Sequence, residues 1–115
     1  MESTIVKIME LLDNVKIFHW KTKSYAEHKA SDSLHESLSG HVDKFAEVYI
    51  GANVRFDFVN KRNLHIVDHT KKGICTCVRD FIQHMGGLKL AGDLSNIREE
   101  IIATCNQFLY LMTLD

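Results

Sequence analysis

Hydrophobic side chains recur every three or four residues along two long stretches in the first half of the chain. This spacing places them on one face of an α-helix. The first stretch covers residues 3–22, with Ile5, Ile8, Leu12 and Val15 in its stripe and Met9 and Phe18 beside it. The stripe of the second stretch consists of Leu34, Leu38, Val42, Phe45 and Tyr49. Ser24 and Glu27 form a capping-box pattern that starts this second helix near Tyr25, and Gly51 is a typical stop.

Helical spacing returns in the second half of the chain. The third stripe consists of Ile74, Val78, Phe81, Ile82 and Met85 and ends at Gly86 and Gly87. A fourth helix begins near Asp93, with the stripe Leu94, Ile97, Ile101, Phe108 and Met112. Residues 52–70 alternate between hydrophobic and polar positions, so that a small hairpin and an irregular crossover fit this segment equally well.

Four helices with one hydrophobic stripe each bury those stripes most economically in a four-helix bundle. The long second connection favours a ferritin-like bundle, with a crossover between the second and third helices. The chain contains no proline, which agrees with long helices and short connections. The sequence therefore predicts a single all-α domain that covers residues 1–115.

Composition narrows the class of protein. Of the 115 residues, 45% are hydrophobic and 25% charged, and the net charge is −1. This is ordinary for a cytoplasmic globular protein, and no stretch is hydrophobic enough for a membrane span. The basic residues are scattered, which argues against DNA binding. The three cysteines are expected to be free thiols, and Cys75 and Cys77 are expected to pack in the core.

The second helix also carries a ladder of potential metal ligands. Its members are His28, Asp32, Asp43 and Glu47. On a helix they fall at about 0°, 40°, 60° and 100°, on a flank separate from the hydrophobic stripe. Two pairs with i,i+4 spacing result, but they lie roughly 16 Å apart along the axis, too far to share an ion within one chain.

A symmetric dimer would bring the two halves of the ladder together. If the second helix packs against an antiparallel copy about a two-fold axis midway between Ser37 and Leu38, His28 meets Glu47 of the other chain. Asp32 then meets the other Asp43. One interface would thus build two equivalent sites. Three small residues near that axis would let the backbones approach, namely Ser33, Ser37 and Gly40.

His19, at the end of the first helix, is a candidate fifth ligand. Imidazole and carboxylate together suit iron, and zinc or manganese fit as well. Trp20, His35 and Glu36 lie beside the ligands and are expected to support them. The same histidines and acidic residues also have a purely structural interpretation. Histidine on a hydrophobic stripe is most often a hydrogen-bonded core residue, and acidic residues at helical spacing usually form a solvated face.

Several pieces of this stretch resemble the Dps family of mini-ferritins. They are the pair His19-Trp20, the spacing of His28 and Asp32, the spacing of Asp43 and Glu47, and the ten residues between the two aspartates. The resemblance implies a homodimer, a larger hollow shell, and a di-iron centre between subunits that oxidises Fe(II) with oxygen or peroxide. Two departures from the Dps pattern argue against the hollow shell and the di-iron centre. His19 and His28 are only nine residues apart, closer than in the Dps motif, and the chain is short.

The whole chain also resembles an uncharacterised group of small proteins from large DNA viruses and tailed phages. The shared pieces are KTKSYAEHKASD, DKFAEVYIG and NIREEIIATCNQFLYLMTLD. This resemblance implies a viral protein in the host cytoplasm or the virion. This resemblance implies no particular activity. The alternative function is a non-catalytic ferritin-like dimer that binds or scaffolds a partner. A second group of possible ligands, His65, Asp68 and His69, is expected to be solvated.

Overall fold

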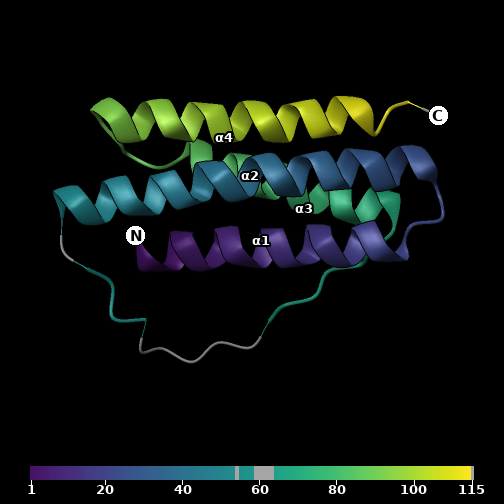
Figure 1. Cartoon of the computed structure of the whole chain (residues 1–115), viewed down its shortest axis with the longest axis horizontal. Coiled ribbons are helices and arrows are strands. Elements are labelled where there is room, and N and C mark those ends of the chain that lie inside the picture. The colour runs from purple at the N-terminus through teal and green to yellow at the C-terminus, as the bar shows by residue number, and fades with distance from the viewer. Residues whose placement is uncertain (54, 59–63, 115) are drawn as a thin grey trace.

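The computed structural model describes residues 1–53, 55–58 and 64–114. Within these ranges the chain forms four α-helices and no β-strand: α1 (Glu2–Lys21), α2 (Tyr25–Ala52), α3 (Lys71–Gly86) and α4 (Gly92–Leu111). The all-α prediction and the four predicted helices are confirmed. α2 and α3 begin at the same end of the bundle, and α1 and α4 run in the opposite direction (Figure 1).

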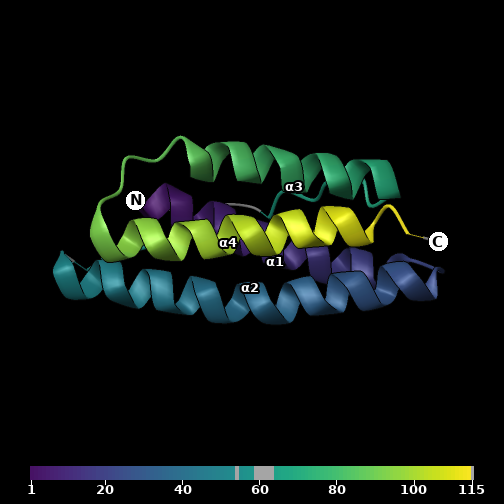
Figure 2. The ribbon, with the colours of Figure 1, turned by 90° about the horizontal axis from the view of Figure 1, so that it is seen from above.

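The helices form a bundle in which each packs against two others. α2 lies against α1 and α4, and α3 lies against the same two helices (Figure 2). α1 and α4 are therefore diagonal to each other, and so are α2 and α3. None of the helices in the described part of the chain is both long and hydrophobic enough to cross a membrane.

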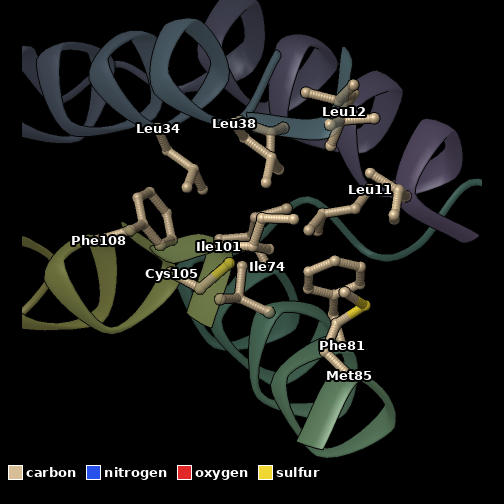
Figure 3. Packing of buried hydrophobic residues seen from close by; sticks show 14 of the residues in the cluster. Leu11, Leu12, Leu34, Leu38, Ile74, Phe81, Met85, Ile101, Cys105 and Phe108 are labelled. Atoms are coloured by element: carbon tan, nitrogen blue, oxygen red, sulfur yellow. The ribbon is translucent and has the colours of Figure 1, made fainter. Parts of the chain in front are cut away.

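The core is built from the predicted stripes. Figure 3 shows side chains from all four helices that meet along the bundle axis. The residues of the four stripes are buried except Tyr49 and Ile82, which are half-buried. Burial of one such side chain contributes about 1.5–3 kcal/mol. Cys75 and Cys105 are also buried in this core, as free thiols. Of the two residues beside the α1 stripe, Phe18 is buried and Met9 is half exposed.

Local hydrogen bonds determine where α2 and α3 begin. Ser24 Oγ accepts from the amide of Glu27, as the capping box predicts. The reciprocal contact differs from the prediction, because Thr22 Oγ1 accepts from the Ser24 amide and donates to the Glu27 carboxylate. Thr70 caps α3 in the same way, with its hydroxyl accepting from the Gly73 amide.

The connection between α2 and α3 is attached to α1 by one buried side chain. The side-chain nitrogen Nδ2 of Asn14 donates to the main-chain carbonyl of His65 at 2.9 Å. The side-chain oxygen Oδ1 of Asn14 accepts from the main-chain amide of Val67 at 3.0 Å. Its oxygen also accepts from His69 Nε2 at 2.9 Å. His69 was expected to be solvated and is buried, so that expectation was wrong. Residues 55–58 and 64–69 have no regular structure. The middle of this segment, residues 59–63, where a small hairpin would have to turn, lies outside the described residues.

Candidate metal-binding face on helix α2

The five predicted ligands divide between the end of the bundle and the outer surface of α2. His19 is buried in the last turn of α1, and His28 is half-buried in the first turns of α2. Asp32, Asp43 and Glu47 are exposed on the outer side of α2. The structure therefore brings the two histidines together and leaves the three carboxylates in solvent.

The two histidines form a reciprocal pair. Their imidazole rings stack with centroids 3.8 Å apart and planes inclined by 20°. His19 Nδ1 lies 2.9 Å from the carbonyl oxygen of His28, and His28 Nδ1 lies 3.0 Å from that of His19. A carbonyl oxygen only accepts, so each Nδ1 carries the proton and donates. In the neutral imidazoles, Nε2 is then the nitrogen with a free lone pair.

This tautomer is the one that a metal-binding histidine commonly uses. A ligating imidazole usually donates its other N–H to a carbonyl or carboxylate, which fixes the ring and its tautomer. The same contacts have a structural role, because they fasten the end of α1 to the start of α2 across the turn at residues 22–24. Ser31 Oγ, 3.4 Å from His19 Nδ1, completes this polar cluster.

The carboxylates of Asp32, Asp43 and Glu47 share the exposed face of α2 with small residues. Within the described chain these three side chains form no hydrogen bond and no ion pair. Gly40 lies between the two aspartates, and a Cβ placed on it would meet no atom within 4 Å. Ser33 and Ser37 are exposed as well, at the edge that faces α4. The face is therefore polar and exposed to solvent.

The three predicted supporting residues lie in different surroundings. His35 is half-buried, and burial lowers its pKa; the charge of Lys16 adds to this shift, while Asp13 and Asp32 oppose it. His35 thus lies between the ladder and the outer side of α1. Trp20 is 69% exposed, with the Lys16 ammonium 5.8 Å from its ring centroid. Glu36 is exposed on α2.

The candidate ligands do not gather into a metal site within one described chain. Among the residues that the structure describes, no group of three or more His, Cys, Asp and Glu side chains could hold a metal ion. His28 and Asp32 lie toward one end of α2, and Asp43 and Glu47 lie toward the other. Any ion bound by both pairs therefore needs two chains.

Sequence reasoning missed Asn14 and His69, the two side chains that hold the connection. A signal was present for Asn14, which interrupts the hydrophobic run of α1 on the side where α3 and residues 64–70 pack. Its meaning depends on a partner more than fifty positions away, so that helical spacing alone could not reveal it.

One phage protein matches a short part of the chain. An uncharacterised 14.6 kDa protein encoded in the mobD-ri intergenic region of Enterobacteria phage T4 is 49% identical over 37 residues. This match covers 32% of the present chain and 29% of the phage protein. It agrees with the resemblance to small phage proteins.

The search of solved structures yields no significant match. The match to a protein family is much longer than the match to the phage protein. The family of unknown function DUF5856 matches residues 19–112, which include both histidines of the stacked pair, the α2 ladder, α3 and α4. The chain therefore belongs to this family of unknown function.

Proposed function

We propose that the protein is a Dps-like iron-binding protein that works as a homodimer and oxidises Fe(II) at two sites shared between subunits. The observation that carries the proposal is the exposed face of α2. It presents Asp32, Asp43 and Glu47 without a hydrogen-bond or ion-pair partner among the described residues of their own chain. A two-fold axis would pair these positions.

The directions of the helices support a ferritin-like bundle. α2 and α3 run the same way, so the chain must return along the bundle between them (Figure 1). One long crossover of this kind is the connection that ferritin-like bundles use. Metal sites in such bundles are built from carboxylates and histidines on facing helices.

Antiparallel pairing of α2 creates a need for a cation. Positions equally far from the midpoint between Ser37 and Leu38 come level with each other, so Asp32 would face Asp43 of the partner subunit. Two carboxylates brought together repel each other unless a positive charge lies between them. His28 would come level with Glu47 of the partner subunit and add a neutral nitrogen ligand. Nitrogen and oxygen donors of this kind suit Fe(II).

The protein's own groups would bind the ion, hold it in position and stabilise its charge. The carbonyl-bound Nδ1 atoms keep both imidazoles in the tautomer whose Nε2 can bind a metal. His28 is more exposed than His19 and is therefore the better placed of the two. Carboxylates stabilise Fe(III) more than Fe(II) and so favour loss of an electron from the substrate ion to oxygen or peroxide.

Aerobic addition of Fe(II), followed by the absorbance of the ferric product, tests this function. We expect wild-type protein to accelerate oxidation and Asp32→Asn and Glu47→Gln to lose most of the acceleration. Asp57→Asn, which removes an exposed carboxylate from the connection, is the matched control and should behave as wild type. If the two α2 variants oxidise iron at the wild-type rate, the assignment is wrong.

One observation favours a second candidate function, a non-catalytic dimer that binds or scaffolds another protein. Lys29 and Lys44 are exposed on α2 beside the ladder. In the antiparallel pair Lys44 would lie near the partner's Asp32, and Lys29 near the partner's Glu47, so lysine could supply the cation. Metal analysis of protein expressed in iron-rich medium separates the two functions, because an intact dimer without bound metal favours the scaffold.

A further inference from the structure

A pocket of about 250 Å³ lies on the opposite side of α1 from the α2 ladder, between α1, α3 and the connection. Its apolar lining consists of Leu11, Val67 and Phe81, and charged side chains from both helices surround it. Because Asn14 holds residues 65 and 67 against α1, the connection forms one wall of the pocket. Neither proposed function uses this pocket.

The charges around the pocket are separated along the helix axes. α1 and α3 are antiparallel, and Thr4 Oγ1 lies 3.1 Å from His84 Nε2, which places Lys7 and His84 at one end. Burial lowers the pKa of His84, and the charge of Lys7 lowers it further. Toward the other end, burial raises the pKa of Cys77, and Asp80 and Glu10 add to that shift. Lys7 therefore supplies the positive charge of the pocket, and Glu10 and Asp80 supply the negative charge about one helical turn away.

These charges form no close ion pair with one another in the described part of the chain. Lys7, Glu10 and Asp80 all line the pocket, yet none of them takes part in an ion pair within the described chain. The same helices carry no other charged side chain into the pocket. A ligand with both a positive and a negative group would satisfy both ends at once.

We propose that this pocket binds a small zwitterion of the α-amino acid class with an apolar side chain. The ammonium group would bind Glu10 and Asp80, and the carboxylate would bind Lys7. The side chain would rest on the apolar lining of Leu11, Val67 and Phe81. The pocket volume of about 250 Å³ fits this class of ligand. Pockets for drug-sized ligands start at about 300 Å³, and an amino acid is smaller than such a ligand. Charge-assisted hydrogen bonds at both ends then provide specificity.

Isothermal titration calorimetry of the full chain tests the proposal, with leucine, alanine and phenylalanine as probes. Two analogues each lack one charge of leucine: 3-methylbutylamine has no carboxylate, and 4-methylpentanoate has no ammonium. We expect at least one amino acid to bind and its counterparts with a single charge to bind at least about ten-fold more weakly. Lys7→Met should weaken amino acid binding by a similar factor, and Lys89→Met, on the α3–α4 loop, should not change it.

Alkylation of Cys77 gives an independent measure of occupancy. Cys77 lines the pocket and is half-buried, whereas Cys75 and Cys105 are buried. A bound amino acid should slow labelling of Cys77 by a thiol reagent in wild type and not in Lys7→Met. Failure of all three amino acids to bind overturns the proposal. It is equally overturned if the analogues bind as tightly as the amino acids, or if Lys7→Met binds as wild type does.

Discussion

His19 and His28 each donate a hydrogen bond from Nδ1 to the main-chain carbonyl of the other, and their rings stack at 3.8 Å. This double contact joins the last turn of α1 to the first turns of α2. In the neutral rings it also selects the tautomer in which Nε2 carries the lone pair. One arrangement thus stabilises the fold and prepares two potential ligands.

Loss of one member of the histidine pair should destabilise the fold even without metal. His28→Ala removes one hydrogen bond and the stacking partner, and leaves the His19 carbonyl without its donor. We expect a loss of about 2 kcal/mol in the free energy of unfolding, measured by urea denaturation in the presence of a chelator. His41→Ala is the control, since His41 makes a partly exposed contact with Glu100, and such contacts contribute little. Equal stability of the two variants would contradict the structural role of the pair.

The Asn14 side chain should prove essential for the connection. Asn14→Leu would leave the Val67 amide, the His65 carbonyl and the buried His69 Nε2 without their partner. A buried polar group without a partner costs about 1–3 kcal/mol. We expect lower stability and faster hydrogen–deuterium exchange at residues 64–70. The exchange of α4 amides should change only as far as global stability does. Unchanged protection at the Val67 amide would show that Asn14 does not hold this segment.

Stability should fall as the solution becomes acidic. Burial lowers the pKa of His69 below its ordinary 6.5, Lys21 adds to this, and Asp68 opposes it. Burial also lowers the pKa of His35 and that of His84. The unfolded chain therefore takes up protons first. The stabilisation is complete above about pH 6.5 and is lost as the pH falls through the lower pKa values of the folded state.

His69→Gln tests the share of this effect that belongs to His69. Glutamine can still donate to Asn14 Oδ1 but does not titrate. Urea denaturation between pH 5 and 7.5 should show a flatter dependence of stability on pH for the variant. The same slope in both proteins would assign the effect to other groups.

Gly40→Ala should change the monomer and the dimer in opposite directions. A Cβ at Gly40 meets no atom of its own chain, so alanine should stabilise the helix by about 1 kcal/mol. At the proposed two-fold axis, however, the same methyl group would keep the two α2 helices apart. Analytical ultracentrifugation should show a weaker dimer. Gly86→Ala, in the last turn of α3, also adds a methyl group in open space and should leave dimerisation unchanged.

The helices could be predicted from the sequence because their signals are local. Ser24 and Glu27 set the start of α2, and the stripe from Leu34 to Phe45 identifies its buried face. Helical spacing does not decide how far the residues beside a stripe are buried. Phe18 is buried and Met9 is half exposed, because their exposure depends on where α2 and α3 pack.

The candidate site was only partly predictable. The positions of Asp32 and Asp43 on one exposed flank follow from helical geometry. The stacked histidines do not, because the turn at residues 22–24 determines how closely α1 and α2 approach. The burial of His69 depends on Asn14, and no spacing within residues 64–70 indicates this contact.

Native mass spectrometry with Fe(II) or Mn(II) added under anaerobic conditions measures chain pairing and metal binding in one experiment. We expect a dimer, or an assembly built from dimers, that retains metal at two equivalent sites for each pair of chains. Asp32→Asn should keep the dimer and lose the metal. A wild-type protein that remains monomeric at all concentrations and retains no metal would contradict the proposed pairing of the α2 helices and the iron site that depends on it.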